Sequence, residues 1–288
     1  MPFKVNTNID ALKAYYQLAK VNSQTTKAQL RMASGKRILQ VADDTSGFNV
    51  GTSLKGKVAV MKGAQNNIAA AKNMLNTAEG ALLGINDLLV SIEGKLSDAT
   101  NPTNDRTALA SDIQALAKEI QATLKNTKFN NTNLLFSAAG SGFVFQVGEA
   151  NDTLNIDYAS SLASSGGGGY ASGISASLSS FVNVSASTLA CTSGASSIQG
   201  LQTALTSLKN AVTEALGDIG NFTQRLNIKS DTLDVAVTNA ESSISRLFDA
   251  DMAMEQLKAT RGQIIGQAAT AMLAQLNMAP QQVLQLFG

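Results

Sequence analysis

The stretch that decides the fold of this chain is residues 61–96, MKGAQNNIAAAKNMLNTAEGALLGINDLLVSIEGKL. Apolar or small side chains recur there in alternating steps of three and four: Met61, Ala64, Ile68, Ala71, Leu75, Ala78, Leu82, Ile85, Leu89, Ile92 and Leu96. Such spacing, kept over many turns, is typical of a coiled-coil seam. We therefore predict one helix over 50–98, about 73 Å long at 1.5 Å per residue.

A second seam of the same kind lies in the last third of the chain. Its residues are Leu201, Leu205, Leu208, Val212, Ala215, Ile219, Phe222, Leu226, Leu233, Ala236, Ala240 and Leu247. Lys229 and Ser243 depart from the pattern. A helix over 201–247 would be about 70 Å long. Because the two lengths match, we expect these helices to pack along each other.

A third, shorter helix is predicted over 105–126, after a break at 101–104 that contains Pro102. Its apolar stripe is Leu109, Ile113, Leu116, Ile120 and Leu124. The short connection makes it antiparallel to the first long helix. The predicted fold class is therefore mainly α, a long antiparallel coiled-coil helical bundle.

Residues 137–198 differ in composition, because Ser, Gly, Ala and Thr dominate them. The segments 142–148 and 153–158 alternate as two strands around a turn at 149–152, which predicts a small β-hairpin. The Gly/Ser run at 164–169 reads as a linker, since no phosphate-binding loop pattern surrounds it. We expect 137–198 to be an insertion into the bundle.

The two ends of the chain contrast in charge. Residues 1–40 carry seven Lys or Arg and one acid, Asp10, whereas residues 262–288 carry no charge. The uncharged tail has a helical pattern, with Ile264, Ile265, Ala268, Met272 and Leu276 on one side and an apolar close at 283–287. It can dock on its own domain or between subunits. We favour the second, because the long helices already occupy each other.

Composition excludes several functions. The chain has no His and one Cys, which removes His-based catalysis, His-ligated metals and a disulfide framework. A net charge of +1 lacks the strong positive charge that is typical of nucleic-acid-binding proteins. A membrane-active tail would need a basic polar face and aromatic anchors, and this one has Gln and no Trp. Asp43 and Asp44 read as a helix boundary. We expect no enzyme activity, metal, cofactor, membrane insertion or cleaved signal peptide.

Motifs at both ends resemble the bacterial flagellins. They include Met32–Ile38, Ala42–Gly47, Thr77–Leu82 and Phe129–Leu135 in the first half. Gln224–Asn227, Ser245–Ala253, Gln267–Asn277 and Pro280–Phe287 follow in the second half. The likeness covers about 1–150 and 200–288, with several linked motifs in the family's order. A hook–filament junction protein shares similar ends and is the alternative, but the quality of the C-terminal match favours flagellin.

The resemblance implies a subunit that polymerises into the tubular flagellar filament for swimming. In flagellins the ends are ordered on polymerisation and line the channel, and the long helices form the next layer. It implies inner arms at 1–45 and 249–288, long outer-core helices at 46–136 and 199–248, and the variable insertion at 137–198. Implied partners are the chain itself, the flagellar type III export apparatus, a chaperone at the C-terminal arm, and filament cap and hook-associated proteins. The implied location is extracellular.

Two sets of residues carry these expectations. Those expected to be buried between subunits are Ile9, Leu12, Tyr16, Ile264, Ala268, Met272, Leu276, Val283, Leu286 and Phe287. Those expected in the coiled-coil core are Met61, Ile68, Leu75, Leu82, Ile85, Leu89, Ile92, Leu205, Leu208, Val212, Ile219, Phe222, Leu226 and Leu233. In many flagellins, arginines on the first long helix are read by a Toll-like receptor of vertebrates; the matching positions here are Ser91 and Glu93.

Overall fold

The computed structural model describes residues 8–135, 143–149, 152–156, 177–190 and 198–287. Its main helices are α1 (Ile9–Ser34), α2 (Thr45–Asp98), α3 (Arg106–Asn126), α6 (Ile198–Phe248) and α7 (Met252–Phe287). The chain divides into two compact units. The terminal unit comprises Met1–Val58 and Thr238–Gly288, and the central unit comprises Ala59–Val237. The expected mainly α fold is confirmed, and the long helices run through the unit boundaries.

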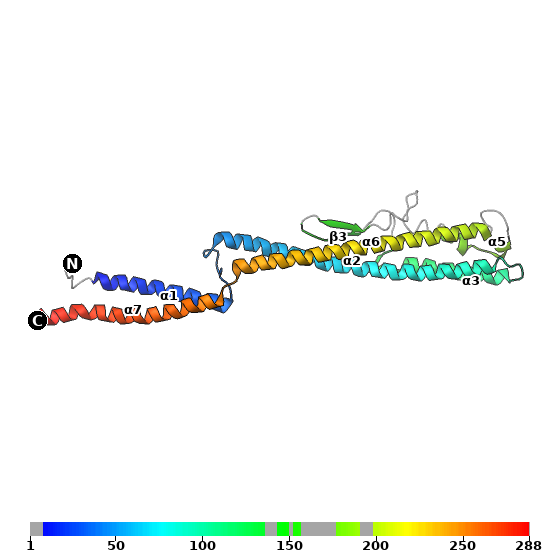
Figure 1. Cartoon of the computed structure of the whole chain (residues 1–288). Coiled ribbons are helices and arrows are strands. Elements are labelled where there is room, and N and C mark those ends of the chain that lie inside the picture. The colour runs from blue at the N-terminus through cyan, green and yellow to red at the C-terminus, as the bar shows by residue number, and fades with distance from the viewer. Residues whose placement is uncertain (1–7, 136–142, 150–151, 157–176, 191–197, 288) are drawn as a thin grey trace. The chain divides into compact units, whose positions relative to one another are not determined.

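In the central unit, α2 and α6 lie side by side and antiparallel (Figure 1). Lys209 Nζ lies 2.7 Å from Glu93 Oε2, and Gln65 donates a hydrogen bond to Asp234. Residue numbers therefore increase along α2 in the direction in which they decrease along α6, as in an antiparallel pair. Every position of the α2 seam from Met61 to Leu96 is buried. Complete burial of a Leu or Ile side chain contributes about 1.5–3 kcal/mol. This seam therefore supplies a large part of the apolar core of the central unit, together with the buried residues of α3 and α6.

The α6 seam is buried from Leu201 to Ile219 and again at Leu226 and Leu233. Phe222 is only half-buried. Lys229, which breaks the pattern, has a partner from outside the helix pair, because its Nζ lies 2.6 Å from Asp152 Oδ2. A charge at this position of the seam is thus neutralised by the segment before β4.

Helix α3 runs antiparallel to α2, and Lys95 Nζ lies 2.7 Å from Asp112 Oδ2 across the pair. Its N-terminus is capped by Asp105, whose Oδ1 accepts from the N–H groups of Thr107 and Ala108. The predicted stripe is partly wrong. Ile113, Ile120 and Leu124 are buried, but Ala110 and Ala117 are buried in place of Leu109 and Leu116, which are half-buried. The buried face of α3 is therefore centred about one residue away from the predicted stripe.

The predicted hairpin is present as β3 (Phe143–Gln146) paired antiparallel with β4 (Thr153–Ile156). Leu154 and Ile156 are buried on its inner face. Asn67 of α2 donates to the Gln146 carbonyl oxygen at 3.2 Å. Together with the ion pair of Lys229, this bond holds the hairpin against both long helices. The Gly/Ser run at 164–169 lies outside the described residues.

A second hairpin, which was not predicted from the sequence, pairs β1 (Lys128–Phe129) with β2 (Thr132–Asn133). Asn130 and Asn131 at its tip have φ values of 48° and 63°. Asn tolerates this left-handed region, and two such residues favour a tight hairpin turn, so the Asn-Asn pair was the available signal.

The later part of the insertion is packed on the bundle. Helix α5 (Ala186–Ala190) contacts α3, and Phe181 before it is fully buried. Gln114 of α3 donates to the carbonyl oxygen of Val184. None of the described helices is long and apolar enough to cross a membrane.

Candidate assembly surface on the terminal helices

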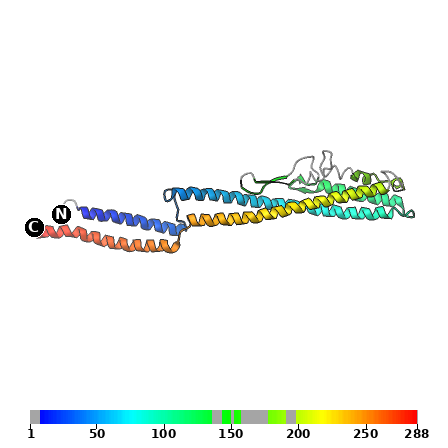
Figure 2. The ribbon, with the colours of Figure 1, turned by 45° about the horizontal axis from the view of Figure 1, so that its top comes forward.

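In the terminal unit, α1 and α7 form a close antiparallel pair, which both ribbon views show (Figures 1 and 2). Asn8, the N-cap of α1, donates through Nδ2 to the carbonyl oxygen of Leu276 at 3.0 Å. At the other end of the pair, Arg31 reaches Glu255. The two ends of the chain, far apart in sequence, therefore fold onto each other.

The face of α7 toward α1 is built mostly from small residues. The positions of α7 that are buried or half-buried are Glu255, Ala259, Gly262, Gly266, Ala269, Leu273 and Leu276. A Cβ placed on Gly262 would overlap Oγ1 of Thr25, and one on Gly266 would lie 3.5 Å from Oδ1 of Asn22. The close approach therefore requires a residue without a side chain at Gly262, whereas a Cβ at Gly266 would make an ordinary van der Waals contact.

A seam of small residues leaves the large apolar side chains on the opposite faces of both helices. On α1 the exposed fractions are 53% for Ile9, 50% for Leu12, 59% for Tyr15 and 64% for Tyr16. On α7 they are 64% for Leu257, 62% for Ile264, 40% for Ile265 and 57% for Met272. Large contiguous apolar surface is uncommon on a soluble monomer and marks an interaction site.

The structure places the ten residues predicted for assembly in three groups. Those on the exposed faces are Ile9, Leu12, Tyr16, Ile264, Ala268 and Met272. Leu276 instead lies in the seam against α1. Val283, Leu286 and Phe287 belong to α7 but lie beyond the last residue whose side chain is described.

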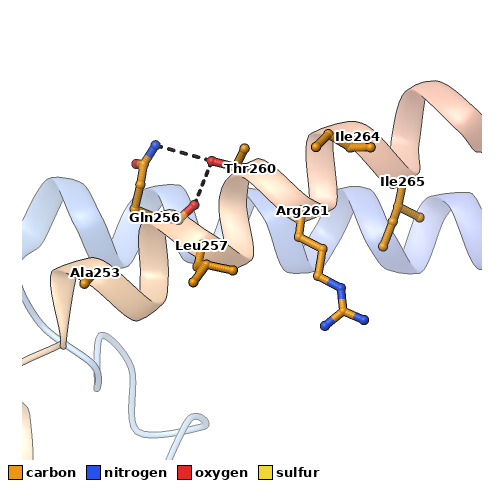
Figure 3. Close-up of a pocket in the computed structure, with 7 residues that line it drawn as sticks. All are labelled: Ala253, Gln256, Leu257, Thr260, Arg261, Ile264 and Ile265. Carbon is orange, nitrogen blue, oxygen red and sulfur yellow. Dashed lines mark hydrogen bonds between the residues drawn. The ribbon is translucent and has the colours of Figure 1, made fainter.

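Sequence reasoning missed Tyr15 on α1 and Leu257 on α7, both strongly exposed. Leu257 begins a second three-four pattern on α7, which continues through Arg261, Ile264 and Ala268. That pattern was the available signal. Figure 3 views this face with α1 behind α7, and Leu257 and Ile264 line a shallow hollow with Arg261 at one edge.

Charged residues tie α1 to α7 and to the loop before α2. Arg31 lies 3.7 Å from Asp43 Oδ1 and 3.9 Å from Glu255 Oε1, and Lys258 Nζ lies 2.7 Å from the same Glu255 oxygen. Glu255 is buried, so these cations compensate its charge. Arg31 thus links three segments of the terminal unit.

The pKa of Asp43 lies below its ordinary value. The main cause is the N–H group of Leu39, which donates to its carboxylate, with the Gln40 N–H and the charges of Arg31 and Lys27 acting in the same direction. Burial opposes them. Asp43 is therefore held as an anion that organises the 39–43 loop.

Two other acids of this region, Asp44 and Asp251, cap helices, as expected for the Asp43-Asp44 boundary. Asp44 Oδ1 accepts from the N–H of Gly47 at 2.8 Å in the first turn of α2. Asp251 Oδ1 accepts from the N–H groups of Ala253 and Met254 at the start of α7. Among the described residues, no group of three His, Cys, Asp or Glu side chains is arranged to hold a metal ion.

Phe248, the last residue of α6, anchors the start of α2. Its ring lies edge-on to Phe48 at 6.1 Å between centroids, and Lys55 Nζ lies 3.9 Å from its centroid. The Phe248 carbonyl oxygen accepts from Arg37 N–H, and Gly35 accepts from the N–H of Ala250. The two loops that lead into the terminal helices are therefore joined to each other.

We expect Gly51→Ala to destabilise the terminal unit, because a Cβ at this position would overlap the ring of Phe248, which is 3% exposed. Overpacking of this kind costs about 1–3 kcal/mol. Gly56→Ala is the matched control, since no atom lies within 4 Å of a Cβ placed there. It should raise helix stability by about 0.5–1 kcal/mol. Urea unfolding followed by circular dichroism measures both, and equal stabilities for the two variants would contradict the assigned Phe248 contact.

Two family models match the chain at its two ends. The model of the bacterial flagellin N-terminal helical region matches residues 5–139. The model of the bacterial flagellin C-terminal helical region matches residues 198–287. Together the two matches include all of α1, α2, α3, α6 and α7.

Individual relatives agree with these matches. The chain is 31% identical to a flagellin of Listeria monocytogenes, over 98% of this chain and 99% of that one. It is 30% identical to a flagellin of Listeria innocua over the same shares. A solved structure described as a putative flagellar hook-associated protein from Vibrio parahaemolyticus matches 72% of this chain and all of that chain, with a TM-score of 0.55. At 16% identity, that likeness concerns the fold alone.

Proposed function

The chain belongs to the bacterial flagellin family and is a structural subunit of the flagellar filament, and from this premise we propose that α1 and α7 are the elements buried between neighbouring subunits. One observation carries the proposal: the small-residue seam that joins α1 to α7 leaves their large apolar side chains exposed. Burial of those side chains against other copies would supply the free energy of assembly.

The kind of contact between neighbouring subunits determines whether they form a closed ring or an open polymer. A patch on one copy that binds a different patch on the next makes a heterologous contact, and such contacts form an open helical polymer when they do not close into a ring. The terminal helices fit this role, because apolar surface that is costly in a free subunit becomes buried in the polymer. Ordering of the terminal helices on polymerisation belongs to the same proposal.

The remaining functional assignments rest on family membership. We propose that the subunit is exported through the flagellar type III apparatus and works outside the cell. A chaperone would cover the C-terminal arm before export, and cap and hook-associated proteins would contact the finished polymer. Flagellins are a structural protein family, and no catalytic role is proposed for this chain.

Seeded growth tests the proposed function. Purified subunit is added to short sonicated filaments, and filament length is followed by negative-stain microscopy. We expect long tubular filaments. Seeds that stay short while the subunit remains monomeric would contradict the proposal and favour a hook–filament junction protein, which forms a ring without polymerising.

We expect weak or no activation of the vertebrate Toll-like flagellin receptor. Flagellins that it reads carry arginines where this chain has Ser91 and Glu93, and both side chains are exposed on α2. Glu93 is also engaged by Lys209. A reversed charge at a recognition site opposes binding. Reporter cells that express the receptor would be titrated with pure monomer.

The matched variant for this test carries Ser91→Arg and Glu93→Arg together. It should raise the response of the reporter cells above that of the unchanged monomer. Strong activation by the unchanged monomer at nanomolar concentration would contradict the prediction, and receptor-negative cells control for contaminants.

A further inference from the structure

The exposed face of α7 carries a base between two apolar residues. Leu257 and Ile264 are seven residues apart, and Arg261 lies between them in sequence. In Figure 3 the Arg261 side chain points toward the lower edge of this face, and Ile264 points toward the upper edge. Leu257 is 64% exposed and Ile264 is 62% exposed. We call Leu257, Arg261 and Ile264 the basic stripe. Within the described part of the chain, the Arg261 guanidinium makes no hydrogen bond or ion pair.

The exposed face of α6 carries the complementary arrangement. Ile228 and Val235 are also seven residues apart, are 58% and 62% exposed, and have Asp231 between them. We call Ile228, Asp231 and Val235 the acidic stripe. The Asp231 carboxylate is exposed and has no hydrogen-bond or ion-pair partner among the residues that the structure describes.

The two stripes match in length as well as in charge. Seven residues of helix span about 10 Å, so the two apolar residues of either stripe are separated by the same distance. When Arg261 and Asp231 face each other, each helix places one apolar residue before the ion pair and one after it. These residues are Leu257 and Ile264 on α7, and Ile228 and Val235 on α6. Such contacts would exclude water from around a bidentate Arg–carboxylate pair, which is the geometry that guanidinium groups favour.

The need for a partner is physical. In the proposed function α7 becomes buried, and a guanidinium buried among Leu and Ile side chains is costly unless an acid compensates it. The surrounding charges favour an acidic partner, because Lys258 lies one turn from Arg261, and Lys27 and Arg31 of α1 line the adjoining groove. Glu255, the one acid of that groove, is already paired with Lys258 and Arg31.

We propose that the basic stripe of one copy binds the acidic stripe of a second copy, with Arg261 paired to Asp231. This inference rests on the proposed function and specifies one of the contacts that it requires. The contact is heterologous, because it joins different surfaces of two copies, and therefore suits an open polymer.

Charge reversal tests the contact in seeded growth. Arg261→Asp places two acids opposite each other, and Asp231→Arg places two bases opposite each other. Like charges in an interface cost several kcal/mol, so each variant alone should elongate wild-type seeds about tenfold more slowly or worse. Both side chains are exposed, and the circular dichroism spectrum of each monomer should match that of the wild type.

A mixture of the two variants is the decisive measurement. The Arg261→Asp copy then carries two acids and the Asp231→Arg copy carries two bases, so both kinds of neighbour contact become complementary when copies alternate. An equimolar mixture should therefore elongate at close to the wild-type rate, and both variants should enter the filament in equal amounts by mass spectrometry. The variant that carries both substitutions should also grow.

Two controls accompany the mixture. Glu214→Arg reverses another exposed acid of α6 outside the acidic stripe and should leave growth unchanged. Arg261→Lys keeps the charge and should grow far better than Arg261→Asp. Rescue by the double variant without rescue by the mixture would assign the pairing to a single chain and overturn the proposal, as would wild-type growth of either reversal variant. Failure of the wild type itself to elongate seeds would instead overturn the proposed function.

Discussion

Deletion of residues 262–288 should abolish filament growth while the central unit stays folded. The deletion removes the part of α7 that contains Gly262, Gly266 and the exposed Ile264, Ile265 and Met272. Each large apolar side chain that becomes buried contributes about 1.5–3 kcal/mol, and about 1.4 kcal/mol corresponds to a tenfold change in affinity. Loss of those three side chains alone should weaken subunit addition about a thousandfold or more.

The measurement combines seeded growth with circular dichroism. The helices of the central unit should persist, because residues 59–98, 106–126 and 198–237 do not depend on α7 for their buried seam. A matched control removes residues 160–175 from the Ser/Gly-rich insertion and should still elongate seeds. Growth of the truncated chain at the control's rate would show that the outward face of α7 does not drive assembly.

Leu89→Ala should strongly lower the free energy of unfolding of the central unit. Leu89 is 0% exposed in the middle of the α2 seam, between Ile85 and Ile92, which are also fully buried. Truncation of a buried leucine removes its transfer free energy and leaves a cavity, which together cost about 2–5 kcal/mol. For a unit of this size we expect the melting temperature to fall by about 5–15 °C.

Val90→Ala is the control for this substitution. Val90 follows Leu89 in the sequence, and its side chain is 51% exposed on the other side of the helix. A surface change of this kind should alter the free energy of unfolding by no more than about 0.5 kcal/mol. Thermal and urea unfolding of the monomers give both values. Similar losses of unfolding free energy in the two variants would mean that Leu89 does not belong to the buried seam.

The sequence predicted the helices well because helix formation is read from a local repeat. A three-four spacing places its members on one face whatever the partner is, so Met61 to Leu96 could be assigned to the core without knowledge of α6. The helix boundary at Asp43 and Asp44 was predicted from an equally local signal. The Asn130-Asn131 hairpin was also available from the sequence and was missed.

Other features depended on which surfaces meet. Lys229 looks like a defect in the α6 seam until Asp152 is placed beside it, and this requires the docking of the β3–β4 hairpin. Leu109 and Leu116 fit a helical stripe as well as Ala110 and Ala117 do, and only the packed neighbours of α3 select the alanines. The spacing of apolar residues locates the buried face of a helix to within about one residue, but it does not show which residue lies at the centre of that face.

The terminal helices separate most clearly what the sequence determined from what the tertiary structure decided. The sequence by itself determined that 262–288 is an uncharged helical segment and that it carries apolar residues to be covered. The tertiary structure decided which of its faces meets α1. Gly262 lets α7 approach Thr25 of α1 closely, so the small-residue face became the seam and Leu276 joined it. Leu257, Ile264 and Met272 were left on the outside. Hydrophobicity alone would favour the opposite face, and the close fit of the two backbones decides between them.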